Sequence, residues 1–211
     1  MTKNSSTEKS SRVTLSRVLL LLASAVLVLT LGVVVYAVRV RASARELIDS
    51  ASAIHSTADA ERQIAMWRNR SGRDFWESTS PKDGDHSYDI HVDNGLLYRL
   101  RVAPPTMIGM TITMRDSKLR YVNLTMFTGR DSSKTAGVWV QEWFGSGTAN
   151  DFRVNTKDRP SKATLEFSSA IPDSQREKAF ALNAGCVVRL AGCRNAEDIL
   201  PYVWQWSGQE Q

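Results

Sequence analysis

The sequence MIGMTITMRDSKLRYVNLTMFT, residues 107–128, alternates apolar and polar side chains on both sides of a short polar break. The apolar positions are Ile108, Met110, Ile112 and Met114 before the break and Val122, Leu124 and Met126 after it. A period of two places such side chains on one face of a strand, and Asp116-Ser117-Lys118 has turn chemistry. The stretch therefore predicts two paired antiparallel strands, residues 107–114 and 119–128.

Strands are also expected on either side of this pair. Residues 87–102 predict a β-hairpin with the three-residue loop Asp93-Asn94-Gly95, because pairing Val92 with Leu96 then keeps the apolar residues on one side. Residues 138–144, 152–156 and 163–168 predict three further strands. About seven strands without a long helical crossover predict an antiparallel meander.

Helices are expected after the sheet. Pro172 is suited to the first turn of a helix that we expect to run to about Leu190 and to present Phe180 to the sheet. A second helix begins at Asn195, whose side chain is a good N-cap. The expected fold class is α+β: an N-terminal transmembrane helix continuing into an amphipathic helix, then the meander packed by C-terminal helices.

The transmembrane helix is predicted from residues 18–38, VLLLLASAVLVLTLGVVVYAV. These 21 residues contain no charge, Pro, Asn or Gln, and as a helix they extend for about 31 Å, which matches the hydrocarbon core of a bilayer. Residues 1–39 hold five of the 27 Lys and Arg but one of the 22 Asp and Glu. The basic surplus is therefore a membrane collar, and nucleic-acid binding by the nearly neutral remainder is disfavoured.

The side of the membrane is predicted from weaker signals. Basic residues are almost equally frequent before and after the span, so the positive-inside rule does not select an orientation. Cys186 and Cys193 are the two cysteines, and a disulfide between them indicates an oxidising compartment. We expect an uncleaved signal anchor, because the apolar run is long and Arg39 and Arg41 follow it. The N-terminus is then cytoplasmic and the domain periplasmic or at the cell surface.

A narrow apolar stripe follows the span at alternating steps of three and four residues. It predicts one amphipathic helix over residues 41–68. The stripe consists of Ala44, Leu47, Ala51, Ile54, Ala58 and Ala65. Two interpretations remain open: the stripe packs on the chain's own domain, or it joins copies of the chain into a homo-oligomer.

Residues suited to catalysis or metal binding are few. Of three histidines, His91 lies between Asp89 and Asp93, which a solvated charge ladder explains as well as an acid–base centre does. The run from Asp83 to Asp89 spaces oxygen ligands as a calcium loop does but lacks its glycine and its final acid. Two cysteines and a remote histidine do not make a zinc site. We expect no enzyme activity, cofactor or metal.

Two groups of residues are candidates for binding. Met110, Met114 and Met126 share one strand face and are either core residues or the lining of an apolar pocket for a lipid or small ligand. Six tryptophans are either buried anchors or parts of a protein-binding surface. The sequence does not distinguish these alternatives.

The layout of a hydrophobic N-terminal helix, an amphipathic continuation, an antiparallel sheet and a late cysteine pair resembles that of type IV pilins. The processing signature of pilins is absent, because no Gly precedes a Phe- or Met-led apolar run and no Glu stands five residues into it. The resemblance implies an assembly subunit that lacks this signature.

The expected organisation is a tail (1–17), a transmembrane helix (18–38), a juxtamembrane helix (39–77) and an α+β domain (78–211). The leading hypothesis is a membrane-anchored binding or scaffold module of the cell envelope, with a protein partner or a second copy bound to it. A carrier of lipid or a small apolar ligand and a pilin-like subunit are the alternatives.

Overall fold

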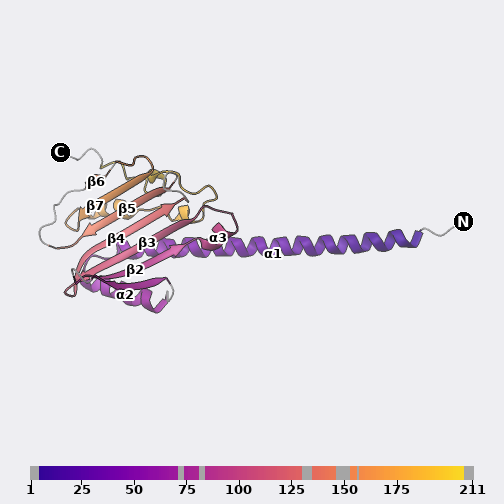
Figure 1. The fold of residues 1–211 in the computed structure, drawn as a ribbon, viewed down its shortest axis with the longest axis horizontal. Coiled ribbons are helices and arrows are strands. Elements are labelled where there is room, and N and C mark those ends of the chain that lie inside the picture. Colours follow the sequence, from indigo (N-terminus) through magenta and orange to yellow (C-terminus); the bar gives the residue numbers. More distant parts are fainter. Residues whose placement is uncertain are drawn as a thin grey trace. The chain divides into compact units, whose positions relative to one another are not determined.

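The computed structural model describes residues 5–70, 74–80, 84–129, 135–145, 153–155 and 157–206, and it divides the chain into two compact units, Met1–Arg39 and Val40–Gln211. The described residues form helices and a seven-stranded sheet of mostly antiparallel strands, as expected of an α+β protein (Figure 1). The juxtamembrane segment from Val40 onward belongs to the second unit.

The first unit consists of the N-terminal part of helix α1 (Ser5–Ser52). The leucines and valines of residues 18–35, except Val33, expose about half or more of their surface. Among the described residues, Arg17–Ser52 is the one helix long and apolar enough to cross a membrane.

The sheet has the strand order β1-β2-β3-β4-β5-β7-β6. The strands are β1 (Phe75–Thr79), β2 (His86–Asp93), β3 (Thr106–Arg115), β4 (Lys118–Thr128), β5 (Ala136–Trp143), β6 (Arg153–Asn155) and β7 (Lys162–Ser168). The predicted pair is confirmed: β3 and β4 are antiparallel partners, and Asp116 and Ser117 form the turn with positive φ values of 50° and 58°. The five strands from β1 to β5 are neighbours in chain order.

The prediction of a complete meander was wrong at the last three strands. β7 pairs with β5 in parallel, and β6 lies outside β7 as the edge strand. β7 takes the inner position because Ala163, Leu165 and Phe167 are buried apolar residues, whereas β6 offers Val154 alone. Burial of apolar area therefore outweighs chain order here.

The predicted hairpin at residues 87–102 was also wrong. β2 pairs with β3 on one side and with β1 on the other, and residues 95–99 form a short helix, α3 (Gly95–Arg99). The cause is the buried side chain of Asn94: its Oδ1 accepts from Thr106 N at 2.9 Å, and its Nδ2 donates to Pro104 O and Val187 O, both at 2.8 Å. These bonds turn the chain away from β2 before a second strand can form.

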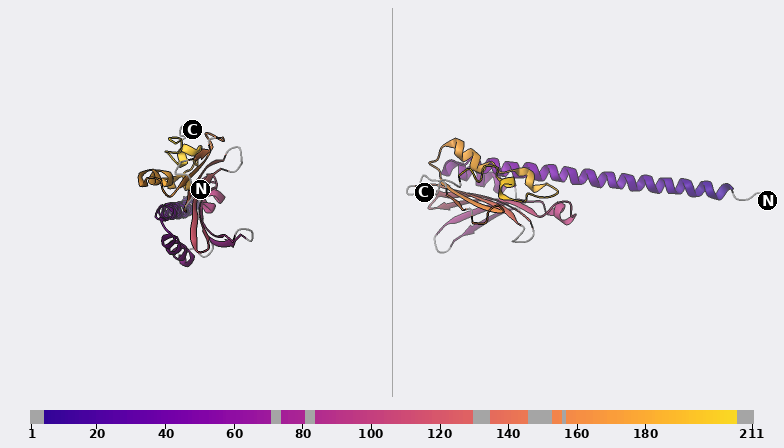
Figure 2. Two further views of the ribbon diagram at one scale, coloured as in Figure 1. Left: turned by 90° about the vertical axis from the view of Figure 1, so that its left-hand side faces the viewer. Right: turned by 90° about the horizontal axis from the view of Figure 1, so that it is seen from above.

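One face of the sheet, here called the inner face, forms the core. The C-terminal part of α1 from Val40 and helices α2, α4 and α5 lie on this face (Figure 2). The buried residues of the inner face include Ile90, Ile108, Met110, Ile112, Val122, Leu124, Met126, Val138, Val140 and Leu165. Helices bury Ala44, Leu47, Ala51, Phe180 and Ile199. The core is thus a single layer between the helices and the inner face.

The expected amphipathic helix over residues 41–68 is broken into two. α1 ends at Ser52, and α2 (Thr57–Arg70) begins after Ser56, whose side chain caps it: Asp59 N donates to Ser56 Oγ at 3.2 Å, and Ser56 Oγ donates to the Asp59 carboxylate at 2.8 Å. The hydrogen bond from Ser56 and then the one from the His55 backbone lower the pKa of Asp59. The break changes the phase of the stripe, so α2 buries Ala60, Ile64 and Trp67 in place of Ala58 and Ala65.

The helix expected from Pro172 to about Leu190 is shorter than predicted. α4 (Asp173–Phe180) ends after two turns, and a 3₁₀ helix, η1 (Ala184–Val187), follows with Asn183 as its cap. Asn183 N donates to Ile199 O at 2.7 Å, which ties this turn to α5 (Ala196–Ile199). The predicted cap of α5 is confirmed, since Asn195 accepts from Asp198 N at 2.8 Å. The expected disulfide joins Cys186 and Cys193, whose Cα atoms are 5.4 Å apart.

Replacing Leu47 with Ala should lower the free energy of unfolding by about 2–5 kcal/mol, because Leu47 is completely buried and the change leaves a cavity. Denaturant unfolding of the full-length protein in detergent, followed by tryptophan fluorescence, measures the loss. Ala65→Ser on the exposed side of α2 is the control and should change the value by less than about 0.5 kcal/mol. A loss below about 1 kcal/mol for Leu47→Ala would contradict packing of this segment on the domain.

Candidate functional site: the outer face of the sheet

The other face of the sheet, the outer face, has none of α1, α2, α4 and α5 lying on it (Figure 2). Cross-strand partners point to the same side, so the register identifies its residues. One row across the strands contains Trp76, Asp89, Thr111, Asn123, Gln141 and Glu166. The next row contains His91, Gly109, Thr125, Trp139 and Thr164, and the third contains Asp93, Met107, Phe127, Gly137 and Lys162.

Aromatic side chains are frequent on the outer face. Trp76 exposes 59% of its surface and Trp139 exposes 41%, although both stand on strands. The Trp76 ring lies edge-on to the ring of His91, with centroids 4.7 Å apart. Tyr121 and Trp143 form a second ring pair at 5.0 Å. Exposed, rigid aromatic rings of this kind are typical of binding surfaces.

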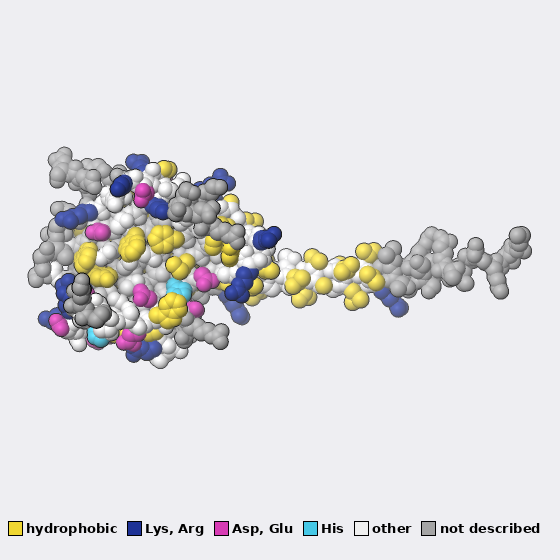
Figure 3. Space-filling model, viewed as in Figure 1, with side chains coloured by type: hydrophobic (Ala, Val, Ile, Leu, Met, Phe, Trp, Pro, Cys, Tyr) yellow, Lys and Arg dark blue, Asp and Glu magenta, His cyan; other side chains and the backbone are white. Residues whose placement is uncertain are grey.

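Charged groups are absent from the middle of the outer face. Every outward position described between 107 and 113, 121 and 127, and 137 and 143 holds an aromatic, Met, Gly, Ser, Thr, Asn or Gln residue. Hydrophobic side chains gather on the side of the sheet seen in Figure 3, with Lys and Arg mainly around them. This composition matches the core of a protein–protein interface, which is enriched in aromatics and Met and depleted of charge.

A pocket of about 320 Å³ lies where the outer face meets α3. Its lining includes Asp93, Tyr98, Pro105, Met107 and Phe127. Phe127 is held beside the pocket because its ring lies against Gly137 on the neighbouring strand, where a Cβ atom would be 2.4 Å from the ring. Gly137 is therefore required for the position of Phe127. The pocket is mostly apolar, with one carboxylate, that of Asp93, in its wall.

The methionines that the sequence offered for an apolar pocket lie elsewhere. Met110, Met114 and Met126 are buried on the inner face, with at most 6% of their surface exposed. Met107, one of the alternating outward residues, lines the pocket. The period-two pattern identified the two faces correctly, but it gave no reason to prefer the outward methionine.

The stripe residues and the tryptophans also divide between buried and exposed positions. Ala44, Leu47, Ala51 and Ile54 are buried within the chain, whereas Ala58 and Ala65 are exposed. This burial favours the interpretation in which the stripe packs on the chain's own domain. Among the tryptophans, Trp67 and Trp206 are buried and Trp76 and Trp139 are exposed.

The candidates for catalysis and calcium binding are not brought together. Asp83 lies outside the described residues, Asp85 accepts from Arg115 at 2.5 and 3.0 Å, and Asp89 accepts from Thr111 Oγ1 at 2.6 Å. Among the described residues, no group of three His, Cys, Asp or Glu side chains is placed to hold a metal ion. The ring of His91 packs on Trp76.

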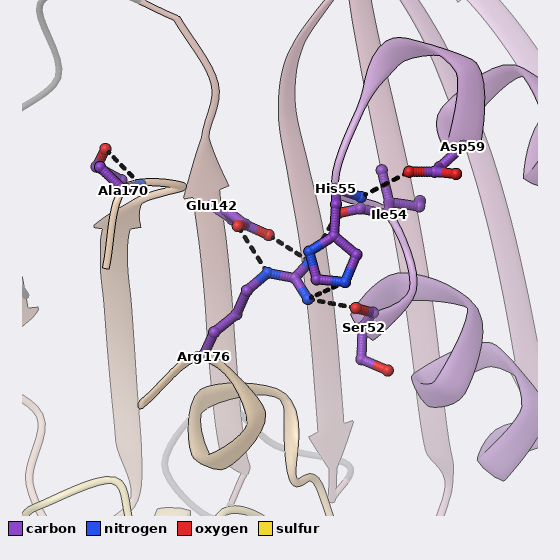
Figure 4. Close-up of polar contacts among 8 residues, drawn as sticks. Ser52, Ile54, His55, Asp59, Glu142, Ala170 and Arg176 are labelled. Carbon is purple, nitrogen blue, oxygen red and sulfur yellow. Dashed lines mark hydrogen bonds and ion pairs between the residues drawn. The ribbon is translucent and has the colours of Figure 1, made fainter. Parts of the chain in front are cut away.

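A buried ion pair lies on the inner face. Arg176 of α4 donates from Nε and Nη2 to the two carboxylate oxygens of Glu142 on β5, both at 2.8 Å (Figure 4). Its Nη2 also donates to Ile54 O at 2.7 Å, and its Nη1 donates to Ser52 O and lies 3.4 Å from Nε2 of His55. We call these residues the Arg176 cluster. It connects α4, β5 and the break between α1 and α2.

The Arg176 cluster has a structural role. Burial raises the pKa of Glu142, while the Arg176 guanidinium opposes this change. Both side chains are almost completely enclosed, so a substrate cannot reach them. Sequence reasoning missed the pair because nothing local links positions 34 residues apart. A Glu at an inward position of an apolar strand was the available signal, since such a residue needs a buried partner.

Comparison with known protein families, curated proteins and solved structures finds no match to this chain.

Replacing Arg176 with Met should lower the free energy of unfolding by about 3–5 kcal/mol, because it leaves the Glu142 carboxylate buried without its partner. The double variant Arg176→Met/Glu142→Leu should recover part of this loss, since it also removes the unpaired Glu142 carboxylate. Denaturant unfolding of the four proteins of this cycle measures the coupling.

The control for this cycle is Arg68→Met, which breaks the exposed pair of Arg68 with Glu77 and should cost less than about 1 kcal/mol. Additive losses in the double variant would show that the buried pair is not coupled.

Proposed function

We propose that this protein is a membrane-anchored binding module of the cell envelope that holds a protein partner on the outer face of its sheet. The observation that carries the proposal is the group of aromatic residues on this uncovered face, with Trp76 and Trp139 exposed. Exposed apolar and aromatic side chains that gather into one patch are typical of an interaction surface.

The size of the face agrees with a weak or transient partner. Five strands lie about 4.8 Å apart, and each is about seven residues long with a rise of about 3.3 Å per residue, so the face has an area of roughly 550 Å². Standard interfaces bury about 800 Å² on each partner, and transient complexes bury less. Neutral hydrogen-bonding side chains such as Thr111, Asn123 and Gln141 lie among the aromatics and suit a polar, reversible contact.

Anchoring in the membrane is part of the proposal. The apolar length of α1 supports a spanning helix over residues 18–38, and the disulfide supports an oxidising compartment for the domain. In this orientation the basic N-terminal tail is cytoplasmic, and the domain displays its outer face outside the cytoplasm.

A second candidate is the binding of a small apolar ligand in the pocket at α3. The pocket volume of about 320 Å³ lies at the lower end of the range for small-molecule sites, and Pro105, Met107 and Phe127 give it an apolar wall. Organic extraction of the purified protein followed by mass spectrometry tests this candidate. A Met107→Lys variant that still retains the same ligand would exclude this pocket as the site.

Single added cysteines should report the orientation. Cys186 and Cys193 are buried and joined, so they give little background with a membrane-impermeant maleimide. Ser174→Cys on the exposed part of α4 should be labelled in intact cells, and Ser6→Cys in the tail should be labelled after permeabilisation only. The opposite pattern would place the domain in the cytoplasm.

Photo-crosslinking should detect the partner of the outer face. A photoreactive phenylalanine in place of Trp76 or Trp139 of the full-length protein in its own membrane should give the same adduct from both positions after irradiation. The same residue in place of Glu177, which is exposed on α4, is the control and should not give it. No adduct from positions 76 and 139, or an equal adduct from position 177, would contradict the proposed function.

A further inference from the structure

We propose that the outer face binds a basic polypeptide segment, whose Lys or Arg side chains contact the end of the face formed by β1, β2 and β3. The inference rests on the proposed function and names the chemistry of the partner. We call this end the Trp76 patch: Trp76, Asp89, His91, Asp93, Met107 and Thr111.

The first argument is charge complementarity. The described outward residues of β1, β2 and β3 between 76 and 113 that carry a formal charge are Asp89 and Asp93, and both are acidic. The face as a whole is not acidic, because Glu166 on β7 has Arg153 as its cross-strand partner, and Lys162 lies on the same face of β7, two outward positions away. Among the described residues, neither Asp89 nor Asp93 forms an ion pair, so their negative charge is concentrated where Trp76 is exposed. A partner with positive charge is attracted to this end in preference to the other.

The second argument is the combination of carboxylates with aromatic rings. A Lys or Arg side chain gains most where its charged end meets a carboxylate and its stem or guanidinium lies on a ring. Trp76 supplies such a ring next to Asp89 in the same row. The pocket supplies a second arrangement, because Asp93 shares its wall with Tyr98 and Phe127. The pocket thus suits one basic side chain, and Trp76 with Asp89 suits its neighbour.

The third argument is that carboxylate and amide oxygens in this region have unused capacity to accept hydrogen bonds. Asp93 uses Oδ1 to accept from Gly95 N, and Asp89 uses Oδ1 to accept from Thr111; among the described residues, the second oxygen of each carboxylate accepts no hydrogen bond. Asn123, next to Thr111 in the same row, is 94% buried, and among the described residues its Oδ1 has no partner. Lys and Arg side chains donate hydrogen bonds and have no acceptor atoms, so a basic segment matches these acceptor oxygens.

The test uses the full-length protein in nanodiscs of zwitterionic lipid, so that a basic probe does not bind the membrane. The probe is a synthetic peptide that alternates Lys with Trp and Ser, and its fluorescence anisotropy reports binding. The same peptide with acetylated lysines should bind at least tenfold more weakly. A higher salt concentration should weaken binding of the unmodified peptide, because salt screens the attraction between opposite charges.

Two variants locate the site. Asp89→Asn keeps an oxygen that accepts from Thr111, and Asp93→Asn keeps one that accepts from Gly95 N, so each variant should fold normally. Each should lower the affinity for the peptide about threefold to fivefold. The double variant Asp89→Asn/Asp93→Asn should lower the affinity for the peptide about tenfold or more. Glu177→Gln removes the same charge from α4, away from the face, and should leave the affinity unchanged.

Equal binding of the acetylated peptide, full affinity of the double Asn variant, or an equal loss in Glu177→Gln would each overturn the inference. The photo-adduct separates this failure from failure of the proposed function. An adduct from positions 76 and 139 whose contacted segment has no Lys or Arg would refute the basic partner and leave the binding surface in place. No adduct at either position would refute the binding surface itself.

Discussion

The buried guanidinium of Arg176 is the contact on which the arrangement of the second unit depends. It supplies donors to both oxygens of Glu142 and to the carbonyls of Ser52 and Ile54, which no helical N–H satisfies at the end of α1. A cation at a helix C-terminus also complements the helix dipole. Because these groups are buried, each needs its partner, and α1, β5 and α4 are held together at one point. The break at residues 53–56 is thereby stabilised and α2 can turn back along the sheet.

This arrangement places the C-terminal part of α1 and helices α2, α4 and α5 on one face of the sheet and leaves the other face without a covering helix from this group. The C-terminal part of α1, α2, α4 and α5 share the inner face, where Leu47 and Phe180 are completely or almost completely buried. The outer face keeps Trp76 and Trp139 in contact with solvent. Gly137 leaves room for the Phe127 ring beside the pocket, so the same strands that build the core on one side position the pocket and the exposed aromatic residues on the other.

The candidate site could be predicted from the sequence in part. Alternation along residues 107–128 assigns Met110 and Met126 to one face and Met107 and Phe127 to the other. It does not say which face the helices cover, and so it cannot tell a buried tryptophan from an exposed one. The acidic end of the face could not be predicted either, because Trp76 lies on β1, a strand that the sequence pattern had not indicated. Asp89 and Asp93 were noticed as neighbours of His91, as the end of the calcium-like run and as part of the expected hairpin loop, and none of these placed them beside an exposed tryptophan.

Features that depend on neighbouring residues were available from the sequence, and features that depend on distant residues were not. The apolar length of residues 18–38, the period of two in β3 and β4, the turn between them and the cap at Asn195 all follow from short-range geometry and solvation. The inner position of β7, the contacts of Asn94 with residues 104, 106 and 187, and the pairing of Arg176 with Glu142 join segments far apart in the chain. The free energy of burial selects among such pairings, and it is a property of the packed molecule, since a side chain's burial is set by what covers it.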